Sequence, residues 1–301
     1  MIWNKTYPVY HCYQRLIDKG VIFYSDLDHL MYFTIICAKA PKYDIVILKL
    51  VQMWDHLHQS VSEMRTGHMR AFFCDVTSTF SREYNNCYNR RGALFEGPFG
   101  RAKKVSEKSI RTNLLYLDNN PVERQLVKCA EEYRWNYLAY AVSDHPFSEK
   151  IKLREASMKL RKALKRVKYC HKKGLYLTVP VLKSLYKGLS EKETEQLTDF
   201  IISCYSVIDY EVAGSYFKSY EDELLAAKAT TGREYDLNEH FLGRSDKYYS
   251  VMEHLLLKYG KVEDVHEILS MSMENKKTLL SFLRNRMGVP VKQIAAFLHI
   301  V

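Results

Sequence analysis

The spacing of apolar and polar positions differs between the two halves of the chain. The first half mixes patterns typical of strands and helices, whereas helical periodicity dominates after residue 149. The elements expected in the first half are strands over residues 9–14 and within 45–61, and helices over residues 25–40, 64–89 and 106–119. A glycine-punctuated loop is expected over residues 91–100, and Pro121 is expected to end the third helix. This order predicts an α+β domain over residues 1–148.

The second half is expected to form a helical domain over residues 149–301. A stripe of apolar residues at helical spacing runs through its first segment: Leu153, Ala156, Leu160, Ala163, Leu164 and Val167. Near the end of the chain, two helical patterns flank a Met-Gly-Val-Pro turn at residues 287–290. Residues 277–300 therefore resemble the start of a helix-turn-helix, and a plain helical bundle is the alternative.

Composition places the chain among globular proteins. Of 301 residues, 47% are hydrophobic and 27% charged, with only 12 Gly and 7 Pro. No apolar run approaches the roughly 20 residues of a membrane span, and the N-terminus has no secretory pattern. Seven cysteines, none closer than thirteen positions to another, support neither a zinc motif nor a disulfide framework. We expect a cytoplasmic, nucleoid-associated protein without a membrane partner.

The net charge of +10 is concentrated in one segment. Residues 150–173 contain eleven Lys or Arg and one Glu, which accounts for the whole net charge, because the remaining basic and acidic residues cancel. A neutral protein with one strongly basic element favours a polyanionic partner, nucleic acid before membrane. The alternative is a solvated helix face.

Two histidines in the second expected strand have the spacing of a metal site. His56 and His58 are separated by one residue, so a strand would direct both imidazoles to one face. That arrangement suits a divalent metal ion. Such pairs also arise by chance, and two half-exposed strand histidines are the alternative.

The expected helix over residues 106–119 presents a tyrosine on a polar stripe. Ile110, Leu114 and Leu117 form its apolar face, whereas Tyr116 lies with other polar residues at helical spacing: Thr112, Asn113 and Asn120. The alternative is an amphipathic surface tyrosine, since the chain has 23 tyrosines.

Between these motifs lies a stretch rich in glycines, aromatic residues and cations. Residues 84–104 include Phe95 and Phe99 among the glycines, together with Arg90, Arg91, Arg101, Lys103 and Lys104. Such a loop could approach phosphates closely while its rings stack on bases. An ordinary glycine-bearing loop is the alternative.

The order of these pieces resembles the single-tyrosine HUH transposases, in particular the group associated with repetitive extragenic palindromes (REP). The resemblance covers roughly residues 7–140. The motifs that carry it are Tyr10-His11 with Arg15, Ile22-Phe23, Met53-x-x-His56-Leu-His58, Asn89-Arg-Arg-Gly92-x-Leu-Phe95-x-Gly97, Tyr116-Leu-x-x-Asn120-Pro-Val122 and Tyr133-x-Trp135-x-Tyr137.

The resemblance implies a ferredoxin-like domain that cuts and rejoins single-stranded or hairpin DNA. His56 and His58 match the paired metal ligands, Tyr116 the nucleophile, and Asn120 the residue that completes the metal site. A tyrosine phenol has a reference pKa of about 10, so Mg²⁺ or Mn²⁺ on the scissile phosphate would supply the activation that the side chain lacks. The products would be a 5′-phosphotyrosine and a free 3′-OH, made by a monomer or a homodimer.

The chain departs from the family pattern at several positions. Gln59 and Ser60 follow the histidines where aliphatic residues are usual, and Trp54-Asp55 precedes them in place of a polar residue and Asn. Leu16 stands where Gly is more usual. As a strand residue, Asp55 would point to the face opposite His56, and we therefore do not expect it to be a ligand unless the strand bulges.

The basic residues supply the expected DNA contacts. They are Arg15, Arg90, Arg91, Arg101, Lys103 and Lys104 in the first half, and Arg161, Lys162, Lys165 and Arg166 in the basic segment. Two rival functions stay open: a non-catalytic DNA-binding regulator derived from such a transposase, and a replication-initiation or conjugative nickase with the same chemistry.

Overall fold

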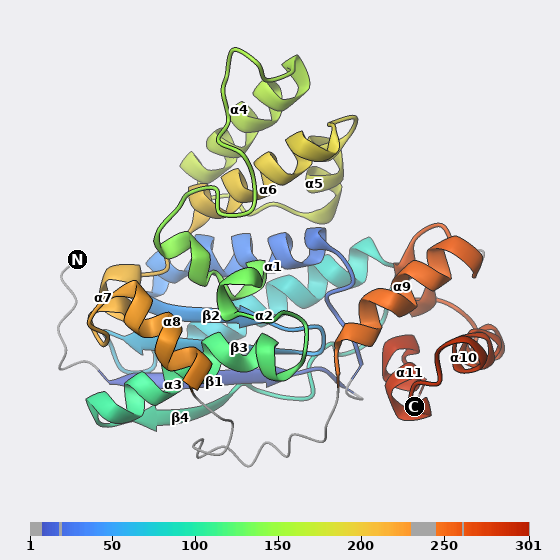
Figure 1. Cartoon of the computed structure of the whole chain (residues 1–301), viewed down its shortest axis with the longest axis horizontal. Coiled ribbons are helices and arrows are strands. Elements are labelled where there is room, and N and C mark those ends of the chain that lie inside the picture. Colours follow the sequence, from blue (N-terminus) through green and yellow to red (C-terminus); the bar gives the residue numbers. More distant parts are fainter. Residues whose placement is uncertain (1–7, 18–19, 230–244, 261, 301) are drawn as a thin grey trace.

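A four-stranded antiparallel sheet organises the part of the chain that the structure describes. The computed structural model describes residues 8–17, 20–229, 245–260 and 262–300 (Figure 1). The strands are β1 (Val9–Arg15), β2 (Ile45–Gln52), β3 (His56–Glu63) and β4 (Gly100–Lys104). They lie in the order β2-β3-β1-β4, and each neighbouring pair is antiparallel. The predicted α+β class with an antiparallel sheet is confirmed.

Helices cover both faces of this sheet. The helices α1 (Asp26–Lys39) and α2 (His68–Cys87) pack together on one face, and α3 (Glu107–Glu123) packs on the other (Figure 1). A further layer, α4 (Met158–Lys172), α5 (Val179–Tyr186) and α6 (Glu191–Tyr205), lies outside α1. The short 3₁₀ helices are η2 (Ala40–Tyr43), η3 (Ala130–Glu132), η4 (Arg134–Asn136), η5 (Leu138–Ala141) and η6 (Val265–Leu269).

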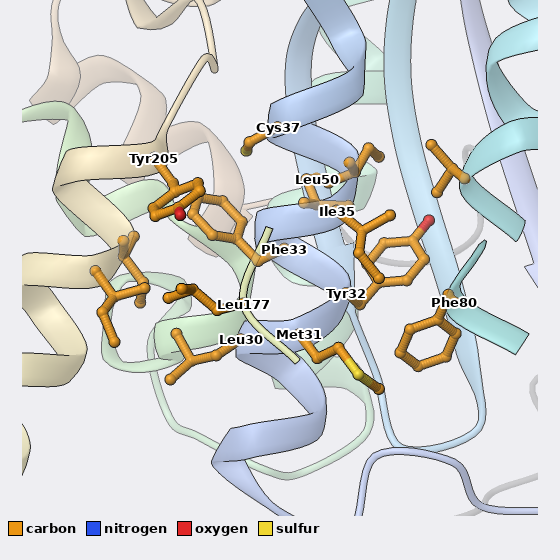
Figure 2. Packing of buried hydrophobic residues seen from close by; sticks show 14 of the residues in the cluster. Leu30, Met31, Tyr32, Phe33, Ile35, Cys37, Leu50, Phe80, Leu177 and Tyr205 are labelled. Atoms are coloured by element: carbon orange, nitrogen blue, oxygen red, sulfur yellow. The ribbon is translucent and has the colours of Figure 1, made fainter. Parts of the chain in front are cut away.

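The helix α1 is the centre of the main hydrophobic core. Its residues 28–37 are all buried, so other parts of the protein pack around the whole helix and not only against one apolar face. Figure 2 shows Phe33 directed toward Leu177 and Tyr205 of the outer layer, while Tyr32 points toward Phe80 of α2. One core therefore joins the sheet, α1, α2 and the outer helices.

After α6 the chain returns to the α3 side of the sheet. The backbone nitrogen of Asp209 donates to Ile47 O of β2 at 2.8 Å, immediately before α7 (Tyr210–Gly214). The following helix, α8 (Tyr220–Ala229), packs on α3. The sequence boundary predicted at residue 148 stays a prediction.

The last helices form a second core. The helices α9 (Lys247–Tyr259), α10 (Met273–Met287) and α11 (Val291–Leu298) enclose an apolar cluster that includes Val21 and Tyr24 from the first half. Tyr24 Oη donates to Phe297 O at 2.6 Å, so α11 is tied to the segment before α1. The predicted pair of helices within residues 277–300 is present, and Gly288 (φ 61°) and Pro290 form the turn between them.

Several predicted boundaries are wrong, each for a local reason. The strand structure predicted within residues 45–61 is present as β2 and β3, which a turn at residues 53–55 separates, and β3 continues to Glu63. Pro121 does not end α3, which continues to Glu123, because Arg124 N still bonds to Asn120 O. Leu153 is 63% exposed, because α4 begins only at Met158 after its N-cap Ser157. Part of the predicted loop over residues 91–100 leads into β4, which was not expected.

A bulge in β2 determines which of its side chains face α3. Ile47 pairs with Val61 and Lys49 with Ser60, so Leu48 is the extra residue. Leu48 packs with Val9 and Ile110 on the α3 side, and Lys49 also reaches α3. In a regular strand, adjacent residues would point to opposite faces.

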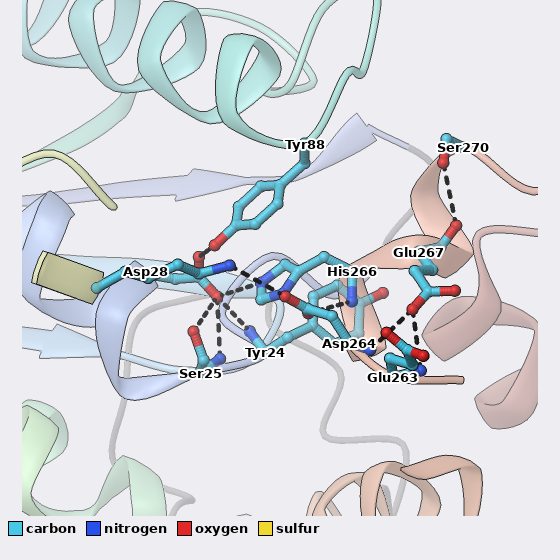
Figure 3. A network of polar contacts seen from close by, with 10 residues as sticks. Tyr24, Ser25, Asp28, Tyr88, Glu263, Asp264, His266, Glu267 and Ser270 are labelled. Carbon is cyan, nitrogen blue, oxygen red and sulfur yellow. Dashed lines mark hydrogen bonds and ion pairs between the residues drawn. The ribbon is translucent and has the colours of Figure 1, made fainter. Parts of the chain in front are cut away.

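A polar network connects the second core to α1 (Figure 3). The Asp28 carboxylate accepts hydrogen bonds from the Ser25 backbone nitrogen at 2.9 Å and from Tyr88 Oη at 2.5 Å, and it lies 2.8 Å from His266 Nε2. The other ring nitrogen of His266 lies 2.6 Å from Asp264, and the Tyr88 ring stacks on the imidazole. Burial alone would lower the pKa of His266, but the two carboxylates raise it to about 9.

The network predicts a pH-dependent contribution of His266 to folding stability. Because the folded-state pKa is raised from 6.5 to about 9, the contribution is fully present below about pH 6.5 and is lost as the pH rises through about 9. We expect His266→Gln to lower the free energy of unfolding by roughly 3 kcal/mol at pH 6. Urea unfolding of both proteins between pH 6 and 10 measures the difference, which should shrink above pH 9. A difference independent of pH would contradict the charged pairing.

None of the described helices is both long and apolar enough to span a membrane.

Candidate functional site

The strands β1 and β3 direct three histidines to the same face of the sheet. In their register His11 is opposite Ser60, Tyr13 opposite His58, and Arg15 opposite His56. Because side chains alternate along a strand, the odd-numbered residues of β1 and the even-numbered residues of β3 share the face that α3 covers. The predicted placement of both imidazoles of the pair on one strand face agrees with this geometry.

The helix α3 brings Tyr116 to this face. The helix begins at the N-cap Ser106, whose side chain accepts a hydrogen bond from Ser109 N. Tyr116 and Asn120 are one helical turn apart, and both are 1% exposed. Of the predicted polar stripe, Asn113, Tyr116 and Asn120 are buried and Thr112 is half-buried, so the alternative of a surface tyrosine is wrong.

The rings of His11, His58 and Tyr116 form a compact buried cluster. His11 Nε2 and His58 Nδ1 are 2.9 Å apart, and the Tyr116 ring centroid lies 5.6 Å from that of His11 and 5.3 Å from that of His58. His56 is adjacent, with its ring centroid 4.8 Å from that of His58. Burial and the nearby charges of His56, His11, Arg124 and Arg15 hold the pKa of His58 well below 6.5. His58 is therefore neutral at pH 7, the form that binds metals.

Asp55 orients His56 instead of pointing away from it. The Asp55 carboxylate lies 2.5 Å from His56 Nδ1, so the expectation that it faces the opposite side of the strand is wrong. The physical reason is that β3 begins at His56, which places Asp55 in the preceding turn, where strand alternation does not apply. When one ring nitrogen donates its proton to a carboxylate, the other ring nitrogen keeps its lone pair available for a metal ion, as in many metal-binding histidines.

Two side chains retain unused polar atoms that fit a metal ion. His56 Nε2 and both amide atoms of Asn120 are buried and have no hydrogen-bond partner among the described residues. Within the same residues, no group of three or more His, Cys, Asp or Glu side chains is arranged to hold a metal. The candidate donors on this face are the imidazoles of His56 and His58 and the amide oxygen of Asn120. The amide oxygen, with phosphate or water, suits Mg²⁺ or Mn²⁺, whereas imidazole ligands are more typical of other transition metals.

A buried ionic group holds α3 and α8 against β2. Lys49 Nζ lies 2.6 Å from Asp118 of α3 and 2.8 Å from Glu223 of α8, and all three side chains are at most 5% exposed. Burial opposes the charge on Lys49, but the two carboxylates raise its pKa above the ordinary value. Burial raises the pKa of Asp118, and the Lys49 charge offsets part of that increase.

The predicted DNA contacts of the first half do not all lie near Tyr116. Arg15 is exposed beside His56, and Lys104 lies on the same sheet face, whereas Arg101 and Lys103 belong to the opposite face of the edge strand β4. Arg90 is bound within its own loop, where it donates to Ala93 O at 2.8 Å. Arg91 is exposed next to it.

The basic helix α4 lies far from the tyrosine. It packs on α6, which packs on α1, so two helical layers and the sheet separate it from α3 (Figure 1). Lys162, Lys165 and Arg166 are exposed there, and Arg161 is partly buried. One surface patch cannot contain both α4 and the tyrosine site. The predicted DNA contact at α4 therefore concerns a separate surface.

Sequence reasoning missed His11 and Lys49 as parts of the site. His11 appeared only as a member of a family motif, and its partner His58 is 47 positions away. Lys49 lies within an aliphatic run of β2, residues 45–51, and a lysine in such a run is itself a signal of a buried ion pair.

Comparisons with known proteins give one distant similarity. No protein-family model matches the chain, and no curated protein matches it. A solved structure of a REP-associated tyrosine transposase bound to a REP hairpin is similar with a TM-score of 0.39 and 15% identity, over 47% of this chain and 85% of that chain. This is a fold-level similarity, which by itself assigns neither family nor activity.

The ionic group around Lys49 gives a prediction about stability. Lys49→Met leaves two buried carboxylates without their cation, and we expect the free energy of unfolding to fall by roughly 3 kcal/mol at pH 8. The loss should be smaller at pH 5, because burial raises the pKa of Asp118 to about 7, so that its carboxyl group is then neutral. Lys108→Met, on an exposed position of α3, is the matched control, measured by the same denaturant titration. Equal losses in the two variants would contradict the ionic role.

Proposed function

We propose that this protein nicks and rejoins single-stranded DNA with a divalent metal ion, through Tyr116. One observation carries the proposal: the Tyr116 ring contacts the imidazoles of His11 and His58, and His56 lies beside them with a buried, unused ring nitrogen. The element order strand, helix, strand, strand, helix, strand also supports the ferredoxin-like HUH fold that the sequence resemblance implies.

The chemistry is a transesterification that Tyr116 begins. The phenol oxygen of Tyr116 attacks the phosphorus of a phosphodiester, and the bond between phosphorus and the 3′ oxygen breaks. The phenol proton is released, and the departing 3′ oxygen takes up a proton to become a 3′-OH. The resulting 5′-phosphotyrosine keeps the energy of the ester, so that attack by another 3′-OH restores a phosphodiester and the free tyrosine.

His56, His58 and Asn120 would hold the metal ion. When bound, Mg²⁺ or Mn²⁺ would polarise the scissile phosphate and stabilise negative charge on the leaving oxygen. Binding through His58 Nε2 requires that His58 donates its Nδ1 proton to His11 Nε2, and Asp55 imposes the corresponding tautomer on His56. His11 and Asp55 are therefore positioning residues.

The burial of Tyr116 favours a second candidate function, DNA binding without catalysis, and the experiment must distinguish it from nicking. Tyr116 is 1% exposed and packs with Leu117 and Met53, so the side chains above it must move before a phosphate can reach the phenol. A chain that binds DNA but never makes that movement would be a non-catalytic DNA-binding regulator. The substrate of the active form would be a hairpin or palindrome with a single-stranded flank, bound by a monomer or a homodimer.

The nucleophile can be identified by covalent trapping. We expect the chain to form a denaturant-resistant adduct with labelled hairpin oligonucleotides in Mn²⁺, visible by gel electrophoresis. Tyr116→Phe should abolish this adduct because the attacking oxygen is gone. Tyr169→Phe, on the exposed surface of α4, is the matched control and should retain it.

Tyr13 is the informative rival because it lies on the same sheet face and is less buried than Tyr116. Loss of the adduct in Tyr13→Phe together with its survival in Tyr116→Phe would assign the nucleophile to Tyr13. Absence of an adduct from the unaltered chain under all metal conditions would favour the regulator.

Metal binding can be tested without DNA. We expect Mn²⁺ titration, followed by calorimetry, to show one site that His56→Ala weakens by at least about tenfold, because an imidazole ligand is lost. His254→Ala removes an exposed histidine from α9 and should bind Mn²⁺ like the unaltered chain. Equal binding by both variants would contradict the assigned ligand.

A further inference from the structure

A basic cavity lies where the loop after α2 meets the C-terminal helices. Its volume is about 520 Å³, within the range of small-ligand sites. Four of its lining residues are basic or histidine: Arg90 and Arg91 from the loop, Lys276 from α10, and His299 after α11. The other three lining residues are uncharged. The cavity therefore concentrates positive charge contributed by both halves of the chain.

Lys276 is the unusual member of this group. It is only 7% exposed, and its Nζ donates to His299 O at 3.3 Å. Lys276 forms no salt bridge with any described residue. Burial and the neighbouring charge of Arg90 both lower the pKa of Lys276. A buried ammonium without a carboxylate is costly, and an anion in the cavity would offset that cost.

The loop that supplies the arginines is fixed rather than adaptable. Arg90 donates to Asn85 Oδ1 at 3.1 Å and to Ala93 O at 2.8 Å, which holds its guanidinium within the turn. Gly92 has φ 90°, a conformation that favours glycine. Arg90 thus adds positive charge at a defined place in the wall of the cavity. The exposed Arg91 can reach a ligand at the rim of the cavity.

The cavity lies at the same end of the sheet as His56. The loop is hydrogen bonded to the end of β1, because Glu96 N donates to Arg15 O at 3.0 Å and Ile17 N donates to Leu94 O at 3.1 Å. Arg15 is in turn the register partner of His56. On the other side, His299 Nε2 lies 2.7 Å from Val21 O, which attaches the C-terminal residues to the same region.

We propose that this cavity binds a backbone phosphate of the DNA strand, held by Lys276 and Arg91, with Arg90 adding positive charge from its place in the turn. The inference rests on the proposed action on single-stranded DNA, and it assigns to α10 a direct role in holding the substrate. Phosphate suits the site because its oxygens accept from an ammonium and a guanidinium at once. The C-terminal helices would thereby fix the strand at the end of the sheet where His56 lies.

The test is a binding measurement that involves neither metal nor cleavage. A labelled single-stranded oligonucleotide with 5′-OH ends is titrated with the full chain in EDTA, and fluorescence anisotropy is followed at several salt concentrations. We expect Lys276→Met to weaken binding roughly tenfold, since a charge-assisted contact is lost. The slope of log affinity against log salt should become shallower by about 0.7, the value for one phosphate of a single strand.

Lys277→Met is the matched control, because Lys277 is the exposed neighbour on the same helix. It should weaken binding less than about twofold, and Lys276→Arg should retain affinity. The melting temperature of Lys276→Met should not fall, since the variant removes an unpaired buried charge. Equal losses of DNA affinity in the two Met variants would overturn the proposal. It would also be overturned if Lys276→Met bound the 5′-OH oligonucleotide normally and lost affinity only for the same oligonucleotide with a terminal 5′-phosphate. Failure of Tyr116 chemistry would leave these results unchanged.

Discussion

The antiparallel register of β1 against β3 is the constraint on which the site depends. It places His11, Tyr13 and Arg15 on the same face as His56 and His58, and this face is the one that α3 covers with Tyr116. A slip of one residue would turn the histidines of one strand toward the hydrophobic core around α1. Because β1 is paired with β3 on one side and β4 on the other, this register is fixed from both sides.

The layer between the sheet and α3 is polar to an extent that stability alone does not explain. It contains the histidines, Asn120 and the Lys49 ionic group beside two small apolar clusters, one around Leu48 and one around Met53. Such groups cost free energy on burial, and local rules of packing are broken most often at functional sites. On the other face, α1 is surrounded by hydrophobic residues, so the main hydrophobic core and the buried polar layer lie on opposite faces of one sheet.

The sequence predicted what depends on local spacing and missed what depends on distant contacts. Strand alternation was enough to place His56 and His58 on one face, and helical spacing was enough to place Asn120 one turn from Tyr116. His11 and Lys49 acquire their roles only through partners 47 and 69 positions away, which no local pattern contains. Likewise, the charge of α4 was visible in the sequence, but its separation from α3 by two helical layers and the sheet was not. The position of Asp55 required knowing where β3 begins.

The most direct test of the account is the chemical identity of the residue that becomes joined to DNA. Mass spectrometry of the protease-digested adduct from the unaltered chain, after nuclease trimming, would locate the nucleotide on a single peptide. The expected product is a 5′-phosphotyrosine at Tyr116. A nucleotide on any other residue would contradict it.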